Sequence, residues 1–393
     1  MFEIDISYDL ENKSKNQIIY SAAFISQEII KVNYNDHTIQ FTLKKKLTKK
    51  FLKNELDKLV NRFSSLNEFT SDIVFTREFS GQGLETSEIN NLIEKGIIQE
   101  VHQGLFIWRE PMSKIMSFID NAVIKKFSNK FMALEEKLPN VISIDSLAKT
   151  NHLSSFPEHL HFISHLEQNL DNIDGYSNSI KSDTSQFKTE SKTSNPEIVH
   201  NPSTCYNCFA ALKNKKITEN MAITAKSSCH RYEASNHNEL GRLLEFDLRE
   251  VIFLGSPEYV RQTREKTLEL VKLLSEEWEL GGSLQSENDP FFTSDFEVKA
   301  KHQRNMKMKY EFRAYLTRSN QSLSIMSSNL HSLTFSKAFN ITCDSWPVHT
   351  GCLGFGIERF AIALISQHGS NIEKWPDKLK KDWIDWIALN NEE

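Results

Sequence analysis

The sequence has no run of about 18 apolar residues and no leader of the kind that directs secretion. Its first residues, Met-Phe-Glu-Ile-Asp, lack the basic start and the apolar stretch of a signal peptide. Cysteine is sparse, with five residues in 393, which fits reduced thiols better than a disulfide framework. We therefore expect a cytoplasmic protein that does not contact a membrane.

An excess of positive charge is also missing. The formal net charge is -5, which argues against a dedicated nucleic-acid binder, because such proteins usually carry a basic face. A local basic run at Lys44–Lys50 is more typical of a solvated face than of a binding site. No glycine-rich phosphate loop of the Walker or Rossmann kind is present.

The composition, 39% hydrophobic and 25% charged, is that of a globular protein with a substantial core. Residues 1–85 predict a small α+β domain, with a hairpin over 29–43 followed by a helix over 51–63. Residues 86–393 predict a second, larger domain. Within it, residues 167–200 are dominated by Asn, Ser, Asp, Lys and Thr, so we expect a flexible insertion there.

The larger domain alternates helical and strand patterns without a βαβ repeat. Apolar spacing and capping residues predict helices over 87–95, 111–131, 257–280 and 357–367. Strand-like stretches lie at 140–144, 230–254, 307–316 and 323–326. The predicted fold class is α+β, an antiparallel sheet flanked by helices.

Residues 230–255 predict a strand, a polar loop and a second strand, and they carry side chains suited to a nucleotide. Arg231 and Glu233 would share one face of the first strand, and Arg242 and Phe246 one face of the second, because side chains two or four apart in a strand point the same way. A guanidinium can donate two parallel hydrogen bonds to a phosphate. A phenylalanine ring can stack on one face of a purine, and a second arginine can cover the other face. The alternative is a charged hairpin with a solvated face.

Arg359 falls in the first turn of the last of these helices, after Gly354 and Gly356, where it suits a terminal phosphate. Its alternative is an ordinary salt bridge. Cys205 and Cys208 form a lone C-x-x-C, and no second pair follows at zinc-ribbon spacing. A catalytic zinc needs only three protein ligands, but lone cysteines are more often buried apolar residues.

The hairpin pattern Arg-x-Glu, loop, Arg-x-x-x-Phe resembles motif 2 of the class II aminoacyl-tRNA synthetases, and Gly354–Arg359 resembles their motif 3. The chain more closely resembles the amino acid:[carrier protein] ligases, which are relatives of the atypical seryl-tRNA synthetases. Shared markers include Gly104–Phe106, Ser155–Pro157, Cys205-Tyr206, Asp289–Phe292, Lys309–Glu311 and Ser327–His331. The chain departs from the family at Leu330 and at Leu333-Thr334.

The resemblance implies a set of site residues and cofactors. It places Zn²⁺ on Cys205, Glu233 and Cys352, with ATP and Mg²⁺ nearby. Arg231 would hold the α-phosphate, Arg359 the γ-phosphate and Phe246 the adenine, with Arg242 also at the nucleotide. Glu311 is the carboxylate expected on magnesium, with a salt bridge inside the sheet as its alternative. Ser327 and Asn329 would line the site.

The implied function is ATP-dependent activation of a small amino acid to an aminoacyl-adenylate, followed by transfer to the phosphopantetheine thiol of a carrier protein. A homodimer is expected, although Asp145-Ser146 stands where the proline of the family's dimer element would be. Two alternatives remain at this point. One is a seryl-like aminoacyl-tRNA synthetase, against which the acidic charge argues, and the other is a catalytically inactive paralogue.

Overall fold

The computed structural model describes residues 1–8, 10, 15–63, 71–79, 87–182, 192–238, 241–287, 308–316 and 322–390. The Asp289–Phe292 stretch named above lies outside these ranges. None of the helices within them is long and apolar enough to cross a bilayer.

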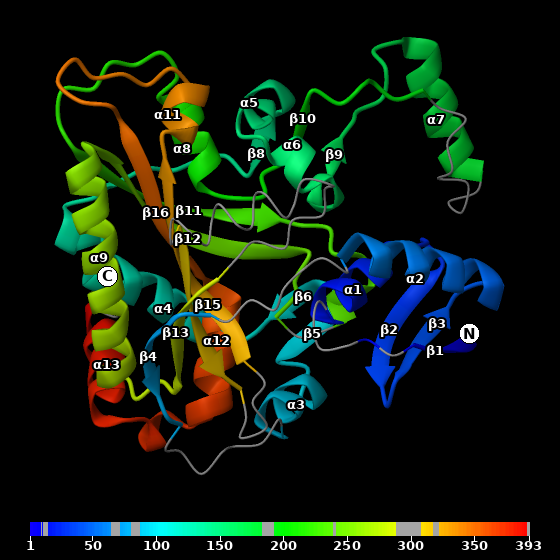
Figure 1. The fold of residues 1–393 in the computed structure, drawn as a ribbon, viewed down its shortest axis with the longest axis horizontal. Helices are drawn as coiled ribbons and strands as arrows, with labels where there is room; N and C mark the ends of the chain where they lie inside the picture. The colour runs from blue at the N-terminus through cyan, green and yellow to red at the C-terminus, as the bar shows by residue number, and fades with distance from the viewer. Residues whose placement is uncertain are drawn as a thin grey trace.

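The N-terminal unit has a core of its own. Strands β1 (Phe2–Ser7), β3 (Thr38–Leu43) and β2 (Ile29–Asn35) form a sheet in that order, and helices α1 (Lys15–Ala22) and α2 (Lys49–Phe63) pack on it. The predicted hairpin and helix are therefore present. The unit ends earlier than residue 85, because strand β4 (Ile73–Arg77) pairs with the large sheet. This unit lies at the right of Figure 1, away from the C-terminal helix.

The larger unit is built on a sheet of eight strands among the described residues, all antiparallel except its last pair. This confirms the predicted α+β class. Across the sheet the strands are β4, β13 (Gly282–Ser286), β14 (Lys309–Tyr315), β15 (Ser322–Ser332), β16 (His349–Gly356), β12 (Glu245–Gly255), β11 (Met221–His230) and β7 (Leu134–Glu135).

Helices cover one face of this sheet and bury its apolar side chains. Figure 1 shows the covering helices, which are α4 (Met112–Lys126), α9 (Pro257–Glu277), α12 (Ile357–His368) and α13 (Asp377–Asn390). One row of residues on this face, opposite one another across five strands, is Leu284, Phe312, Met326, Phe355 and Arg249. Its four apolar members join the main core with Trp278 and Phe360. Side chains alternate in a strand, so the residues between them point to the other face.

Local sequence explains the longest helix. The Ser256 hydroxyl accepts a hydrogen bond from the Tyr259 amide at 3.2 Å, and Pro257 occupies the first turn, where its missing N–H costs nothing. The helix ends shortly before Gly281-Gly282, as the sequence predicts. It delivers Trp278 to the core, where the ring stacks on Phe118 of α4.

A smaller sheet lies beside the exposed face, with strand order β8 (Val141–Ser143), β10 (Ile198–His200) and β9 (Phe162–Ile163). Helix α7 (Leu170–Ser182) and β10 both fall inside residues 167–200. The expectation of a flexible insertion over all these residues was wrong, because Val199 is buried in a local core with Ile142 and Leu147. The shorter elements of the unit are α3 (Ser87–Glu94), β5 (Ile98–His102), β6 (Leu105–Trp108), α5 (Ile144–Lys149), α6 (His152–Ser155), α8 (Cys205–Ala211) and α11 (Thr334–Ala338).

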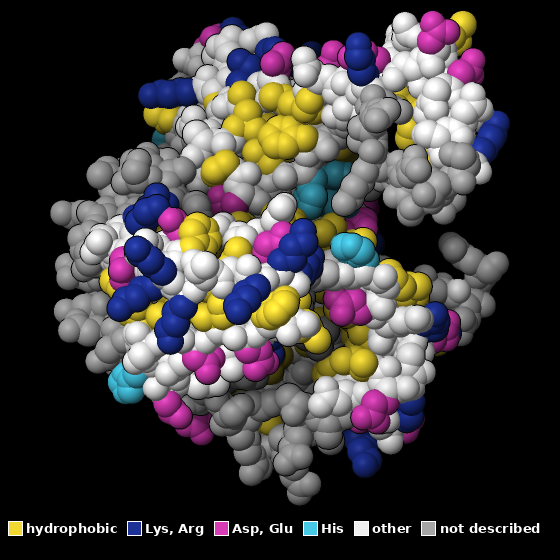
Figure 2. Space-filling model, turned by 90° about the vertical axis from the view of Figure 1, so that its right-hand side faces the viewer, with side chains coloured by type: hydrophobic (Ala, Val, Ile, Leu, Met, Phe, Trp, Pro, Cys, Tyr) yellow, Lys and Arg dark blue, Asp and Glu magenta, His cyan; other side chains and the backbone are white. Residues whose placement is uncertain are grey.

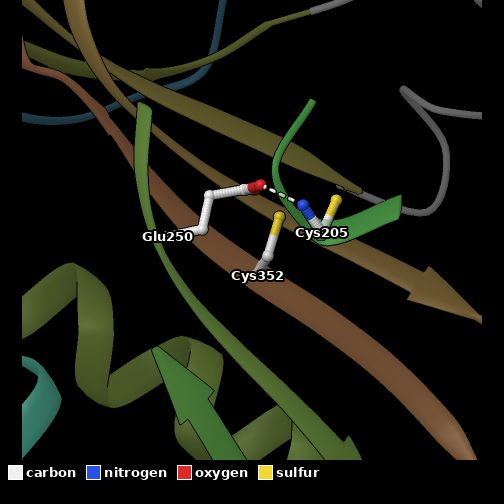
Figure 3. A group of neighbouring side chains, drawn as sticks. All are labelled: Cys205, Glu250 and Cys352. Carbon is white, nitrogen blue, oxygen red and sulfur yellow. Dashed lines mark hydrogen bonds between the residues drawn. The ribbon is translucent and has the colours of Figure 1, made fainter. Parts of the chain in front are cut away.

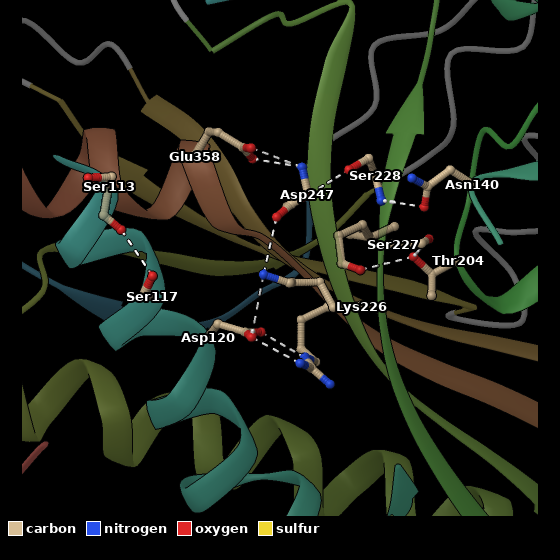
Figure 4. Close-up of polar contacts among 12 residues, drawn as sticks. Ser113, Ser117, Asp120, Asn140, Thr204, Lys226, Ser227, Ser228, Asp247 and Glu358 are labelled. Carbon is tan, nitrogen blue, oxygen red and sulfur yellow. Dashed lines mark hydrogen bonds and ion pairs between the residues drawn. The ribbon is translucent and has the colours of Figure 1, made fainter. Parts of the chain in front are cut away.

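One buried ion pair ties α4 to the covered face. The Arg249 guanidinium donates to both carboxylate oxygens of Asp120, at 2.7 and 2.9 Å, and Lys226 also reaches Asp120 (Figure 4). We expect Asp120→Ala to lower the free energy of unfolding by about 3 kcal/mol, because it removes the bidentate partner of a buried guanidinium and leaves it, among the described residues, only the exposed Glu135 carboxylate. Urea denaturation would measure this. Lys266→Ala removes the exposed Lys266–Glu269 pair and should cost less than about 1 kcal/mol; equal losses in the two variants would contradict the argument.

Candidate functional site

The face of the large sheet opposite α4, α9, α12 and α13 carries a row of polar residues held in register by backbone pairing. Gln285, Glu311, Ser327, Gly354 and Glu250 lie directly opposite one another on strands β13, β14, β15, β16 and β12. Directly paired residues point to the same face. Five strands from distant parts of the sequence therefore present one line of oxygen-bearing side chains, interrupted at Gly354.

The next row on the same face is two residues further along. Lys309, Asn329, Cys352 and Ile252 are opposite one another there. The Asn329 amide nitrogen lies 3.2 Å from the Ser327 hydroxyl and 3.7 Å from the Cys352 sulfur, which links the two rows. Ser327 and Asn329, expected to line the site, are therefore side by side.

Cys352, Glu250 and Cys205 converge on one buried point (Figure 3). Their ligand atoms all lie within 4.8 Å of one another. Cys205 begins helix α8, and its amide donates to a Glu250 carboxylate oxygen at 2.6 Å. The preceding Thr204 hydroxyl donates to the Leu248 carbonyl at 2.9 Å, which fixes the start of α8 against β12.

The electrostatics of this group favour a cation. Burial raises the pKa of the Glu250 carboxyl, and the adjacent Cys205 and Cys352 side chains only partly offset it. The contact with Cys205, burial and the Glu250 carboxylate together raise the pKa of Cys352 well above its usual range. Each of the three groups becomes an anion when it ionises, and all three are buried where water cannot screen their mutual repulsion. A bound divalent metal ion would offset this repulsion.

The carboxylate beside the two cysteines is Glu250, not the expected Glu233. Glu233 lies beyond the last residue of β11, where the chain has left the sheet. Its carboxylate accepts a hydrogen bond from Arg242 at 2.8 Å. Burial opposes ionisation of Glu233, but Arg242 and then Arg359 outweigh it and lower the pKa of the carboxyl. Glu233 is therefore the ion-pair partner of Arg242, with Arg359 also stabilising its charge, and it is not part of the cysteine group.

The hairpin that was predicted over 230–255 is displaced along the chain. Strand β11 ends at His230 and β12 begins at Glu245, so Arg231, Glu233 and Arg242 all lie in the connection rather than on strand faces. The expected pairing of Arg242 with Phe246 on one strand face was wrong. Arg231 is the residue next to the Phe246 ring, with its guanidinium carbon 5.3 Å from the ring centre and its Nε donating to the Pro202 carbonyl.

Arg359 links the last helix to this connection. It lies in the first turn of α12, as predicted, and its Nε donates to the Gly241 carbonyl at 2.6 Å. Its neighbour Glu358 points the other way and accepts from the Asp247 amide with both oxygens (Figure 4). A salt bridge between adjacent Glu358 and Arg359 is therefore not the arrangement found.

Glu311 lies between two cations. Lys309 Nζ is 3.0 Å and Arg313 Nη1 is 3.4 Å from its carboxylate oxygens. Burial opposes ionisation, but Lys309 and then Arg313 lower the pKa of Glu311, so it is an anion at neutral pH. Glu311 therefore makes the salt bridges that were named as its alternative role. Its carboxylate is also a member of the polar row.

The sequence analysis assigned no role to Glu250, Glu287, Lys309 or Arg313, although Lys309 lies in one of the shared markers. Glu287 follows β13 and lies 4.0 Å from Arg313, which gives a second carboxylate beside Glu311. A signal for Glu250 was present, since it is a carboxylate directly before the apolar run Val251–Leu254. Carboxylates are rarely fully buried unless they are paired.

The N-terminal unit reaches the connection between β11 and β12. The Asn236 side-chain amide donates to the Tyr20 carbonyl at 3.2 Å, and the Arg242 guanidinium carbon lies 5.5 Å from the centre of the Tyr20 ring. The Tyr20 hydroxyl is 3.3 Å from His159 Nε2. Two separate units thus hold this connection.

Comparison with known families matches residues 187–368 to the tRNA synthetase class II core domain (G, H, P, S and T). This range includes Cys205, the β11–β12 connection, the polar row and Arg359.

Relatives of two kinds resemble the chain. The type-2 serine–tRNA ligase of Methanococcus maripaludis strain C7 is 24% identical over 353 residues, covering 84% of this chain and 67% of the relative. That of Methanococcus aeolicus is 25% identical and covers 71% and 55%. The amino acid–[acyl-carrier-protein] ligase 1 of Bradyrhizobium diazoefficiens is 28% identical over 251 residues, covering 62% and 74%. The chain thus spans roughly half to two thirds of the length of these serine ligases.

Solved structures share the fold. The M. kandleri seryl-tRNA synthetase in complex with A. aeolicus tRNASec matches with a TM-score of 0.69 at 19% identity, covering 98% of this chain and 78% of that one. A cytoplasmic serine–tRNA ligase of Naegleria fowleri in complex with AMP has a TM-score of 0.60 at 13% identity, covering 85% and 78%.

Proposed function

We propose that this chain activates an amino acid with ATP and passes it to the thiol of a carrier protein, using residues 187–368, which match the class II tRNA synthetase core domain. The polar row and the row next to it are the observation that carries the proposal. Together they bring the carboxylates of Glu311 and Glu250, the Lys309 ammonium group and the Cys352 thiol to one face of the sheet. Cys205 joins them from the start of α8.

Activation needs positioning and charge neutralisation rather than a base. The amino-acid carboxylate, ionised at neutral pH, attacks the α-phosphorus of ATP; a new P–O bond forms and pyrophosphate leaves with the electrons of the broken bond. Arg231 would neutralise the α-phosphate in the transition state. Its position over Phe246 supports this role, because a purine stacked on that ring would have its phosphates near the guanidinium.

Arg359 would hold the terminal phosphate. The hydrogen bond from its Nε to Gly241 supports this role, because it fixes the guanidinium at the start of α12, where backbone amides also favour an anion. Arg242, on the same connection, would lie near the nucleotide with Glu233 as its partner.

Class II synthetases use ATP with Mg²⁺. Glu311 and Glu287 are the carboxylates that would hold that ion here, since oxygen ligands are what Mg²⁺ prefers. Both face Arg313, and the Glu311 carboxylate is kept ionised by Lys309 and Arg313. Ser327 and Asn329 would hydrogen-bond the amino acid beside them.

Cys205, Glu250 and Cys352 would hold a zinc ion. Two thiolates and a carboxylate are a zinc donor set, and a span of 4.8 Å is close to the width of a coordination sphere with Zn–S bonds of about 2.3 Å. Zinc bound there would supply a further coordination position for the neutral α-amino group of the substrate. The chain's own part is to hold the Glu250 oxygen through the Cys205 amide and to place Asn329 beside Cys352.

A carrier protein is the proposed acceptor. Its phosphopantetheine thiolate would attack the carbonyl carbon of the adenylate, forming the thioester and releasing AMP. The relative named as a carrier-protein ligase supports this, because the match covers 74% of its length at 28% identity, and the net charge of -5 does not favour a polyanion.

Charging of tRNA is the second candidate, and the N-terminal unit favours it. Lys44, Lys45, Lys46, Lys49, Lys50 and Lys53 are all exposed. Figure 2 faces this side of the molecule and shows Lys and Arg side chains gathered across it. In contrast, Lys378 and Lys380 on the C-terminal helix are paired with Asp382 and Glu373. The exposed lysines of the N-terminal unit could bind either a tRNA or an acidic carrier protein.

The acceptor can be tested with labelled amino acids, ATP and three acceptors from the source organism: carrier proteins bearing phosphopantetheine, the same carriers without it, and total tRNA. We expect label only on the phosphopantetheinylated carriers, in a bond that hydroxylamine cleaves. The unmodified carriers are the matched control, because they offer the same surface without the thiol. Label on tRNA and on none of the carriers would select the second candidate.

A further inference from the structure

Three histidine rings from three separate segments meet beside the small sheet. His161 directly precedes β9, His200 ends β10 and His230 ends β11. Backbone hydrogen bonds bring them together, since the His200 amide donates to the His161 carbonyl and the His230 amide to the Asn201 carbonyl, both at 3.0 Å. The ring centres are 4.0 Å apart for His200 and His230, 6.2 Å for His161 and His200, and 6.4 Å for His161 and His230.

Most of the ring nitrogens in this trio are buried without a hydrogen-bond partner among the described residues. They are both nitrogens of His161, Nδ1 of His200 and Nδ1 of His230. Leaving a buried polar atom unpaired costs about 1–3 kcal/mol, and several together call for an explanation. A neutral imidazole offers one N–H and one lone pair, so each ring can present a donor atom for a metal.

Two of the three rings, those of His161 and His230, are in the protonation state that metal binding needs. Burial, and then the neighbouring His200 and His237, lowers the pKa of His161 to about 4. Burial, His200 and His161 likewise lower the pKa of His230 to about 4. Both rings are therefore neutral at physiological pH, and their lone pairs are not blocked by protons.

We propose that His161, His200 and His230 form a second metal site that binds a divalent transition ion of the zinc, cobalt or nickel class. Imidazole nitrogen is a preferred ligand of these ions. Three rings placed tetrahedrally around an ion, with nitrogen about 2 Å from it, would have centres about 5 Å apart, and the observed separations lie on either side of this value. The nitrogens are not as tightly gathered as the ligand atoms of Cys205, Glu250 and Cys352, so binding requires the side chains to rotate about both their Cα–Cβ and their Cβ–Cγ bonds.

The surroundings fit such a site. The Glu245 carboxylate lies 3.6 Å from His230 Nε2, which leaves Nδ1 as the atom for the metal and gives that ring the carboxylate partner that metal-bound histidines commonly have. Tyr232 packs edge-on against His161, with ring centres 5.8 Å apart. His230 directly precedes Arg231, so an ion here would tie β9, β10 and the end of β11 together immediately before the residue assigned to the α-phosphate.

Metal stoichiometry tests the site. The full chain is stripped with a chelator, dialysed against excess Zn²⁺ and analysed for bound metal, alongside His161→Gln and the matched control His165→Gln. His165 is an exposed histidine on the same segment. We expect His161→Gln to bind one equivalent less than the wild type and His165→Gln to match the wild type. Equal metal content in folded wild type and His161→Gln would overturn the proposal.

Cobalt separates this site from the cysteine group. Thiolate-bound Co²⁺ shows intense charge-transfer absorption in the near ultraviolet, whereas imidazole-bound Co²⁺ shows only weak visible bands. Cys352→Ser should still bind one Co²⁺, without the thiolate band, and Cys352→Ser/His161→Gln should bind none. Cys352→Ser that binds no Co²⁺ while remaining folded by near-ultraviolet circular dichroism would overturn the proposal. None of these readouts depends on activity, so the result does not rest on the proposed function.

Discussion

Arg359→Ala should lower amino-acid-dependent exchange of pyrophosphate into ATP by at least about 100-fold, because removing one charged donor from a transition state of this kind costs two to three orders of magnitude in rate. The residue begins α12, and its Nε is already anchored on the Gly241 carbonyl, so the guanidinium is held in place before the nucleotide binds. Exchange would be assayed with a mixture of the twenty amino acids, which removes the need to know the substrate.

Two further variants make the result interpretable. Arg261→Ala removes an exposed arginine whose ion-pair partners among the described residues are Glu258 and Glu265 on its own helix, and its exchange rate should equal that of the wild type. Arg359→Lys keeps the charge without the planar fork and should fall between the wild type and the alanine variant. Near-normal exchange in Arg359→Ala would remove this residue from the reaction.

The second large effect concerns the cysteine group. Cys352→Ser and Glu250→Gln should each lose about one equivalent of zinc together with exchange activity, because each removes one of the three protein ligands. Elemental analysis of protein purified without chelator would count the metal. The loss should be independent of the histidine trio, which shares no ligand with this group.

Glu233→Gln is the matched control for Glu250→Gln, since it makes the same chemical change in a carboxylate paired with Arg242. It should keep its zinc. Cys343→Ser, a thiol outside the group, should keep both metal and exchange. Loss of zinc from Glu233→Gln but not from Glu250→Gln would show that the assignment expected from the sequence resemblance was right and that the one made here is wrong.

Sequence patterns correctly predict those helices and strands whose stability depends on residues close to them in the sequence. The helix ending at Phe63, the hairpin before it and the helix after Ser256 depend on apolar spacing, turn residues and a cap, all of which lie within a few residues. The position of Arg359 in a first turn is equally local. These features were predicted correctly for that reason.

The carboxylate beside the two cysteines could not be predicted in this way, because its place depends on pairing between strands about a hundred residues apart. Glu250 reaches the cysteines only because Ile252 lies opposite Cys352, which puts Glu250 one step diagonally away on the same face. A slip of one residue would turn it to the helix-covered side. The motif pattern drew attention to Glu233 instead, which has the same chemistry but follows the end of its strand.

The contact between Tyr20 and the β11–β12 connection affects whether the larger unit can be produced as a fragment without the N-terminal unit. Residues 187–368 contain every side chain proposed here to contact ATP, the amino acid or the zinc ion of the cysteine group, so a fragment with those boundaries would look complete by its motifs. Yet Asn236 donates to the Tyr20 carbonyl and Arg242 lies over the Tyr20 ring. Replacing the N-terminal unit with another would therefore remove contacts that support Arg242 and the β11–β12 connection. The two units have separate hydrophobic cores. The N-terminal unit nevertheless contacts the β11–β12 connection, so exchanging it would change the surroundings of that connection.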